Sequence, residues 1–498
     1  MLFLSILFKE VIKVKEEVKS TASSSVDENI KYLKDLFKDD SDIVFREFYI
    51  GAVKCAIVYI DGMADKMLLN DLLRGLMTRS RYVRYVDNIK DRMMSVSDMK
   101  DLDDLKKGID LVLSGETIMF VEGLKSFYII STRLWPARSV TEPSGETAIR
   151  GSRDGFTETL RFNTALVRRR IRDTRFKIVL KPFGVRSKTD LAIMYINDIV
   201  NTKALKELEK RLSNIKIDAI LDSGYIEQFI EDNKWSFFPQ IQSTERPDVV
   251  ASALYEGRIA IIVDNSPFAI IVPTTMPNLF QSPDDYYQRW IYGSTIRIIR
   301  FISIILSLIL PALYVAVTSF HTGIIPTKLA YFIAASREGV PFPAFVEAII
   351  MEISLALLLE SIARLPKAIG ATTGIVGGLI IGQAAVQAGI VSPIMIIIVS
   401  ITAITSFTTP NYEMTAAFRL IRFLLIIASA IAGLYGIMIG LILTLIHLVK
   451  LKSFGVPYLS PMVNENINDF KDMYLRLPFS FFKRRPRYME TQDKIRQR

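Results

Sequence analysis

The residues best suited to chemistry lie in one arginine-rich stretch, residues 138–172, which we call the signature segment. It contains eight Arg, four acidic residues and no Lys. A guanidinium pairs with a carboxylate through two parallel hydrogen bonds, whereas an ammonium acts as a solvated point charge. The exclusion of Lys therefore predicts fixed, charge-paired contacts rather than loose attraction to any anion.

The acidic residues of the signature segment are the first candidates for acid–base chemistry: Glu142, Glu146, Asp154 and Glu158. A lattice of ion pairs is the favoured interpretation, because the neighbouring arginines can neutralise all four. Four of the arginines, at positions 168, 169, 170 and 172, cannot share one face of a helix. We therefore expect them to contact different neighbours, such as another subunit, a second subdomain or lipid phosphate.

The rest of the chain offers little to a catalytic site. It has only two histidines, His321 and His447, and a single cysteine, Cys55. This composition disfavours a histidine-based metal site, a catalytic triad and an internal disulfide. Phosphate-binding loops, serine-hydrolase elbows and zinc motifs are also missing from the sequence. The sequence predicts neither an enzyme nor a cofactor site.

Charge and hydropathy divide the chain into two halves. Half of all residues are hydrophobic, the mean hydropathy is +0.28 and the net charge is +10. The first ~290 positions are charged and mixed, whereas long uncharged stretches dominate from position 301 onward. A basic protein with an apolar half is expected to lie against anionic lipid, and this explains the charge better than nucleic-acid binding does.

Two stretches have the length and composition of membrane spans, residues 301–318 and 423–446. Residues 368–412 carry no charge and predict two short spans, or one span and a re-entrant piece, broken near positions 389–393. Residues 342–363 are apolar but contain glutamates, so either a spanning or an interfacial helix fits them. Four spans are predicted, with five as the alternative.

Polar and small residues within these apolar stretches are candidates for helix packing or for a pore. Glycines four residues apart allow close helix approach. Amides or carboxylates at membrane depth either bridge helices or face a pore. The packing candidates are Gly374, Gly378, Gly382, Gly436 and Gly440, and the polar candidates are Gln383, Gln387, Glu347 and Glu352.

Arginines beside the first span indicate its orientation. Arg289, Arg297 and Arg300 precede that span, and positive charge is enriched on the cytoplasmic side of membrane proteins. The N-terminal half is therefore predicted to be cytoplasmic.

The N-terminal half contains an internal duplication. The motif AIVYID at 56–61 corresponds to AIMYIN at 192–197, and residues 111–132 match residues 253–274. The offset between copies is 136 residues in the first block and 142 in the second. Each copy predicts a strand, a helical stretch and a hairpin. The signature segment lies between the copies.

The predicted fold is thus α+β followed by all-α, with two duplicated α/β subdomains and a polytopic helical membrane domain. The expected organisation is a flexible N-terminal arm at 1–43, a first subdomain at 44–137, a connector carrying the signature segment at 138–176, a second subdomain at 177–290, a membrane domain at 291–454 and a basic tail at 455–498.

These motifs resemble those of the A-subunit family of spore germination receptors, the GerA family. The resemblance rests on EPSGETAIRGSRDGFTETLRFNTALVRRRIR within the signature segment, on GIVGGLIIGQAAVQAGIVSP in the apolar half and on HLVKLKSFGVPYLSP at 447–461. It covers about residues 40–480. The candidate signature and subunit-contact residues are Arg138, Glu142, Pro143, Glu146, Arg150, Gly151, Asp154, Gly155, Phe156, Glu158, Asn163, Arg168, Arg169, Arg170 and Arg172.

The resemblance implies a nutrient-triggered oligomeric channel in the inner spore membrane that releases monovalent cations. It further implies two partners, a permease-like B subunit that binds the germinant and a C-subunit lipoprotein, and it implies no cofactor. Relatives encoded with the spore dipicolinate-channel genes (the SpoVAF type) share the signature, so an accessory channel of that type is an alternative. A non-conducting scaffold that clusters receptors is the other alternative.

Overall fold

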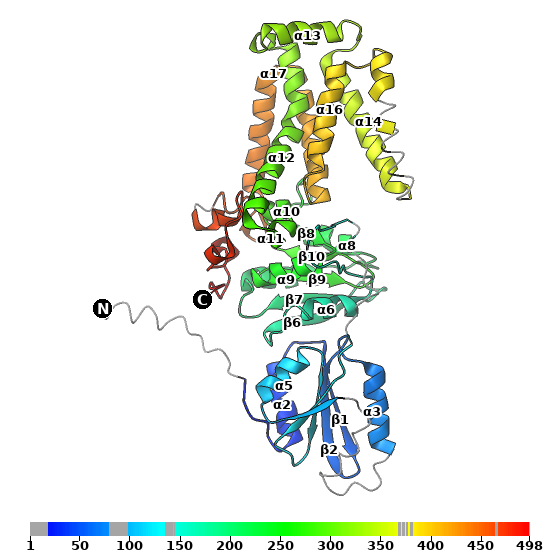
Figure 1. Cartoon of the computed structure of the whole chain (residues 1–498), viewed down its shortest axis with the longest axis vertical. Coiled ribbons are helices and arrows are strands. Elements are labelled where there is room, and N and C mark those ends of the chain that lie inside the picture. The colour runs from blue at the N-terminus through cyan, green and yellow to red at the C-terminus, as the bar shows by residue number, and fades with distance from the viewer. Residues whose placement is uncertain are drawn as a thin grey trace, which may run out of the picture.

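The computed structural model describes residues 18–78, 98–134, 143, 145–366, 370, 374, 377–378, 382–463 and 467–497. Two α/β units and a helical bundle are stacked along the long axis of the molecule, and the second α/β unit lies between the first unit and the bundle (Figure 1). The C-terminal tail lies beside the junction of the second unit with the bundle.

The first α/β unit is an antiparallel sheet with the strand order β1-β2-β4-β5-β3. Its strands alternate between faces, so Ala56 and Val58 face one core whereas Cys55 and Ile57 face the other. The elements of this unit are α2 (Val26–Leu36), β1 (Ile43–Ile50), β2 (Val53–Ile60), α3 (Lys66–Thr78), β3 (Met99–Leu102), α5 (Leu105–Val112), β4 (Thr117–Val121) and β5 (Phe127–Ile130).

The second α/β unit repeats this topology, with the order β6-β7-β9-β10-β8. Ala56 pairs with Phe120 in the first sheet and Ala192 pairs with Ile262 in the second, which reproduces the offsets expected from the duplication. The elements are α6 (Leu160–Arg168), β6 (Phe176–Phe183), β7 (Thr189–Ile196), α7 (Thr202–Ser213), α8 (Ser223–Ile230), β8 (Gln242–Thr244), α9 (Pro247–Tyr255), β9 (Ile259–Val263) and β10 (Ala269–Val272).

The N-terminal arm differs from its prediction where the structure describes it. Helix α2 buries Val26, Ile30 and Leu33 in the core of the first unit. The backbone N–H of Ser41 also donates to the carbonyl of Ile178 in β6 at 2.9 Å. Residues 26–42 are therefore a packed part of the α/β half, because the apolar positions of α2 recur at helical spacing among charges.

The helical half forms one bundle around a shared apolar core. Short helices α10 (Met276–Phe280) and α11 (Asp284–Tyr287) lead into it from the second unit. Its further elements are α12 (Trp290–Ser319), η3 (Thr322–Ile324), α13 (Thr327–Arg337), α14 (Ala344–Arg364), α16 (Pro393–Ser406) and α17 (Tyr412–Lys450).

Helix α17 is a hairpin and not the single span predicted at 423–446. Gly433 has φ 59° and ψ −134°, outside the helical region. A Cβ on Gly436 would lie 2.0 Å from the carbonyl oxygen of Ala428, and one on Gly440 would lie 2.6 Å from Leu425. In a straight helix these pairs would be ~12 Å and ~22 Å apart. The chain therefore reverses at Gly433, giving two arms at 412–432 and 434–450.

Within the described residues, α12 and α17 are the two elements long and apolar enough to cross a membrane, and α17 divides its length between the arms at 412–432 and 434–450. Helix α12 contains the predicted span at 301–318. The uncharged stretch at 368–412 is interrupted by a turn at 388–390, and Pro393 begins α16, in agreement with the predicted break.

The C-terminal tail packs against the rest of the molecule. The side-chain amide of Asn201 donates to the carbonyl of Met489 at 3.0 Å, and Arg485 donates to the carbonyl of Tyr255 at 2.8 Å. Strand β11 (Lys452–Ser453) precedes the tail, whose elements are β12 (Val456–Pro457), η4 (Ile467–Asp472), η5 (Phe479–Phe481) and η6 (Arg487–Met489).

Candidate functional site

Helix α6, near the end of the signature segment, lies between the two α/β units. Leu166 and Val167 pack in the core of the second unit, whereas Ala165 packs in the core of the first. The buried side chain of Asn163 accepts from the backbone N–H of Thr157 at 2.8 Å and donates to the Thr157 carbonyl at 2.5 Å. Asn163 thus fixes the loop that enters α6.

Arg168 joins the two units through a fully buried guanidinium. It donates from Nε and Nη2 to Asp42 at 2.9 and 2.8 Å, from Nη2 to Asp40 at 3.0 Å and from Nη1 to the carbonyl of Phe176 at 3.0 Å. Lys177 adds an ion pair to Asp40 at 3.0 Å. Burial raises the pKa of Asp40, and the charge of Arg168 opposes that rise.

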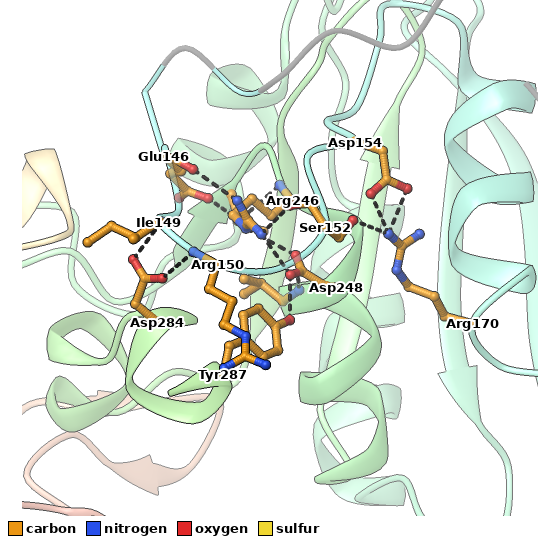
Figure 2. A network of polar contacts seen from close by, with 12 residues as sticks. Glu146, Ile149, Arg150, Ser152, Asp154, Arg170, Arg246, Asp248, Asp284 and Tyr287 are labelled. Atoms are coloured by element: carbon orange, nitrogen blue, oxygen red, sulfur yellow. Dashed lines mark hydrogen bonds and ion pairs between the residues drawn. The ribbon is translucent and has the colours of Figure 1, made fainter. Parts of the chain in front are cut away.

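A second ion pair lies within the signature segment. Nη2 of Arg170 contacts the carboxylate of Asp154 at 2.6 Å and the hydroxyl of Ser152 at 2.8 Å (Figure 2). Among the four predicted carboxylates, Asp154 is therefore one that pairs with an arginine of the same segment. Arg161 instead pairs with Asp61 of the first unit at 3.0 Å.

Glu146 inserts into a polar cluster at the start of α9. The hydroxyl of Thr244 donates to its Oε2 at 2.5 Å. The buried Arg246 donates to the carbonyls of Glu146 and Ser152 at 3.2 and 2.9 Å. Burial, together with the nearby charge of Glu245, raises the pKa of Glu146 to about 7, although the Thr244 hydrogen bond opposes this.

The same cluster reaches helix α11. Arg246 pairs with Asp248 at 2.8 Å, and the hydroxyl of Tyr287 donates to Asp248 at 2.5 Å. Gly151 has φ 131°, and a Cβ there would lie 2.5 Å from the Tyr287 ring. A glycine is required at this position because the segment passes directly over that ring.

Asp284, the first residue of α11, holds the signature segment in place. Its two carboxylate oxygens accept from the backbone N–H groups of Ile149 and Arg150, each at 3.2 Å (Figure 2). The side chain of Arg150 itself is exposed. The contact therefore uses the backbone and leaves the guanidinium of Arg150 at the surface.

The next residue, Asp285, joins α11 to α12. Asp285 is buried and pairs with Arg297 at 3.2 Å and with Arg300 at 2.9 Å. Arg297 also pairs with Asp472 of the tail at 2.8 Å. Arg297 and Arg300 were expected to mark the cytoplasmic membrane surface, but both are buried in ion pairs. They are therefore weak markers of orientation.

A further buried arginine ties four helices of the bundle together. Arg422 of α17 pairs with Glu352 of α14 at 2.9 Å. It also donates to the carbonyl of Ser307 in α12 at 3.0 Å and to the hydroxyl of Ser406 in α16 at 3.1 Å. Glu352 was a predicted polar candidate, and its partner Arg422 lies directly before the predicted span at 423–446.

Glu347, the other predicted carboxylate of α14, is also fully buried. It pairs with Arg337 of α13 at 3.1 Å and accepts from the backbone N–H of Ser392 at 2.8 Å. Both glutamates thus point into the bundle and connect its helices.

The predicted amides and glycines lie in a different part of the bundle. Gln383 and Gln387 are exposed on this single chain. A Cβ on Gly374 would lie 3.0 Å from Ile362 of α14 and one on Gly382 would lie 3.9 Å from Ile396 of α16, whereas Gly378 has open space. Gly436 and Gly440 face the opposite arm of the α17 hairpin.

The remaining signature residues occupy varied positions. Pro143, Gly155 and Phe156 are buried, Glu158 is exposed, Arg169 is half-buried and Arg172 is exposed. Arg138 and Glu142 lie outside the described residues.

Sequence reasoning missed the acidic and aromatic partners of the signature segment. Asp40, Asp42, Asp248, Asp284 and Tyr287 lie far from it along the chain, or in short helices that the sequence did not predict. The sequence did carry one usable indication, because Asp284 and Asp285 follow a proline and precede a long apolar helix.

Comparison with known proteins extends the similarity over both halves of the chain. A family described as Bacillus/Clostridium GerA spore germination protein matches residues 31–488. Spore germination protein KA of Bacillus subtilis is 43% identical over 481 residues, covering 95% of this chain and 88% of that protein. The uncharacterized membrane protein YfkQ of the same organism is 43% identical over 467 residues, covering 93% of this chain and 91% of that protein.

The chain also resembles a solved structure. The N-terminal domain of the A subunit of the Bacillus megaterium spore germinant receptor GerK3 is 35% identical to this chain. The match covers 51% of this chain and 97% of that domain, with a TM-score of 0.41.

Proposed function

The chain belongs to the GerA family of spore germination proteins, and from this membership we propose that it is the A subunit of a nutrient germinant receptor. The proposed role is to convert nutrient binding elsewhere in the complex into ion release across the inner spore membrane. Its proposed partners are further copies of itself, a permease-like B subunit, a C-subunit lipoprotein and membrane lipid.

The proposed mechanism rests on one observation. A continuous series of polar contacts runs from the signature segment to the helical bundle. The segment is bound to Asp284 of α11, and the neighbouring Asp285 binds Arg297 and Arg300 of α12. Helix α12 in turn accepts a hydrogen bond from Arg422, which pairs with Glu352. A displacement of the α/β units would therefore reach α11 through the exposed contacts at Asp284. It would then pass to α12 and the bundle through the buried ion pairs of Asp285 and Arg422.

We further propose that several copies form a cation channel, with the α/β units on the cytoplasmic side. The exposed amides of Gln383 and Gln387 support this arrangement. They lie on the uncharged stretch 382–387, where a single chain leaves them without cover. Repeated around an oligomer, they would supply the polar lining that a cation pathway requires.

The test uses the complete receptor, co-expressed with its two partner subunits and reconstituted in liposomes loaded with K⁺. A panel of amino acids serves as nutrient, since the B subunit of this family resembles amino-acid permeases. We expect nutrient to accelerate K⁺ efflux, and Gln383→Leu with Gln387→Leu to reduce that efflux at least tenfold without loss of assembly. Gln228→Leu, at an exposed amide of α8, is the matched control.

A non-conducting scaffold predicts a different outcome. Liposomes would then release no K⁺ in response to any nutrient, and the double variant would keep both assembly and germination. These two results together would reject the channel and support the scaffold. A SpoVAF-type accessory channel would conduct without any response to the B subunit's ligand.

A further inference from the structure

An exposed aromatic loop lies beside the end of the bundle that faces the second α/β unit. We call residues 234–238, between α8 and β8, the aromatic loop. Its burial alternates: Trp235 is 93% exposed, Ser236 is half-buried, Phe237 is 54% exposed and Phe238 is 2% exposed. An exposed Trp of this degree is unfavourable in water, because its large apolar ring stays hydrated.

The two inward residues fix the loop against the α17 hairpin. The hydroxyl of Ser236 lies 3.0 Å from Nε2 of His447, near the end of the second arm. The ring of Phe238 stacks on His447 at 6.2 Å and meets Phe418, near the start of the first arm, at 6.1 Å. The loop therefore touches both arms.

These contacts set the depth of the loop. His447 lies three residues before the end of α17 and Phe418 six residues after its start. At 1.5 Å per residue, the loop sits about 5 to 9 Å inside the ends of the helices. That is the level at which the apolar part of a spanning helix gives way to lipid headgroups, where Trp is enriched.

Charge and apolar surface around the loop fit a lipid partner. Lys234, Lys450 and Lys452 are all exposed. The last turns of α17 also leave Ile446 and Val449 exposed at 45% and 46%. Apolar side chains on the helix flank and lysines at its end match the acyl and anionic headgroup layers of one leaflet.

We infer that the aromatic loop is a membrane-interface anchor, with Trp235 and Phe237 inserted among the lipid headgroups of the cytoplasmic leaflet. This inference rests on the proposed function, since it requires α17 to lie in the membrane. Its consequence is that the second α/β unit is held on the bilayer surface by its own side chains as well as by α12.

The experiment measures the depth of Trp235 in the full chain. The variant carries Trp135→Phe and Trp290→Phe, so that Trp235 is its single tryptophan. It is reconstituted in phosphatidylcholine and phosphatidylglycerol vesicles, with or without bromine at acyl positions 6 and 7. We expect bromine to reduce Trp235 fluorescence by at least half, and aqueous acrylamide to quench it weakly.

The matched control places Tyr49→Trp in a background where all three tryptophans are Phe. Tyr49 is an exposed residue of β1 in the distal unit, so acrylamide should quench this tryptophan and bromolipid should not. If the chain floats with the vesicles in a density gradient but acrylamide and bromolipid quench Trp235 as they quench the control tryptophan, the proposed anchor is wrong and the proposed function stands. Protection of Trp235 from both quenchers would also overturn it, because a protein partner then covers the loop. A chain that fails to float contradicts the proposed function itself.

If the single-tryptophan variant misfolds, the depth of position 235 can be measured with a nitroxide label instead. The label is attached in the variant Trp235→Cys with Cys55→Ala, since Cys55 is the only cysteine. Greater accessibility to oxygen than to a soluble nickel chelate supports the anchor, and the reverse overturns it.

Discussion

Arg168 shows why the signature segment uses arginine rather than lysine. Its guanidinium makes four hydrogen bonds to three residues, including Asp42, which lies 126 positions away. An ammonium has no planar fork and cannot satisfy the two carboxylates and the carbonyl in this geometry. The residue type therefore follows from a buried junction between two α/β units.

Removing Arg168 should loosen that junction. In Arg168→Met, the buried Asp42 would lose its ion pair and Asp40 would keep only its pair with Lys177, at a cost of about 3–5 kcal/mol. Hydrogen–deuterium exchange of the full chain in detergent should then accelerate at residues 36–46 and 176–181. Arg161→Met is the control, because its guanidinium is 69% exposed and its pair with Asp61 should contribute under ~1 kcal/mol. Equal exchange in the two variants would contradict a role for Arg168 at the junction.

Glu146 gives the protein a stability that depends on pH. Its pKa rises from 4.5 to about 7 on burial. The folded chain therefore binds more protons than the unfolded chain between these values, and stability falls as pH rises through this window. The full effect is at most about 3 kcal/mol.

Glu146→Gln should remove this dependence, because the amide keeps an acceptor for Thr244 but carries no charge. Thermal unfolding of the solubilised chain at pH 5, 6, 7 and 8 measures it. The variant should lose less stability than the wild type between pH 5 and 8, whereas Glu158→Gln, at an exposed acid of the same segment, should follow the wild type. A Glu146→Gln curve parallel to the wild type would show that Glu146 titrates normally.

At the scale of elements, the reversal of α17 decides how the bundle is built. Both ends of α17 lie near the second α/β unit, as the contacts of Phe238 with Phe418 and His447 require. Only a chain reversal between these residues allows both contacts. The conformation of Gly433 is the backbone feature that permits it.

Gly433→Ala should therefore destabilise the bundle. The backbone conformation at Gly433 is essentially restricted to glycine, and an added Cβ would lie 2.8 Å from the His321 ring and 3.0 Å from Phe320. We expect a cost of about 1–3 kcal/mol and a lower thermal unfolding midpoint in detergent. Gly323→Ala, at a position with open space, should leave the midpoint unchanged. Equal midpoints for the Gly433→Ala and Gly323→Ala variants would mean that the reversal is not constrained by Gly433.

The sequence predicted the elements that repeat or that have a strong period. The duplication gave the strand and the hairpin of each unit, because two copies of one pattern confirm each other, whereas the pairing of β2 with β4 and of β7 with β9 came from the structure. It did not give the α17 hairpin, since residues 423–446 are apolar throughout and a break at one glycine leaves the hydropathy unchanged. The sequence also did not predict that α2 packs in the core of the first unit, because the polar composition of residues 1–43 suggested a flexible arm.

The candidate site was only half predictable for a related reason. The signature arginines were evident from composition, but their partners come from other elements. Asp40 and Asp42 precede the first strand, and Asp284 and Asp285 sit in a helix of four residues, too short to show a period. Tertiary contacts of this kind depend on the way the two units stack.

At the scale of the whole molecule, three bodies meet near helix α11. Asp284 on α11 binds the signature segment, Asp285 binds α12, and Asp472 of the tail binds Arg297. Two adjacent carboxylates therefore face in different directions, one toward the α/β half and one toward the bundle. This arrangement lets each connection be removed separately.

Asp285→Asn and Asp284→Asn test whether this junction transmits a signal. Asp285→Asn would leave Arg297 and Arg300 without their shared carboxylate and release α12 from α11, so amide exchange should accelerate in the first turns of α12. Asp284→Asn should instead accelerate exchange at residues 145–152 and leave α12 unchanged. If either contact contributes about 1.4 kcal/mol to the coupling, the nutrient's effect on cation release falls about tenfold in that variant. Both should therefore slow K⁺ release from spores while the complex still assembles.

Spores that release K⁺ at the wild-type rate with both exchange changes present would show that the signal reaches the bundle by another path. The permease-like partner acting on the bundle directly would then be the alternative.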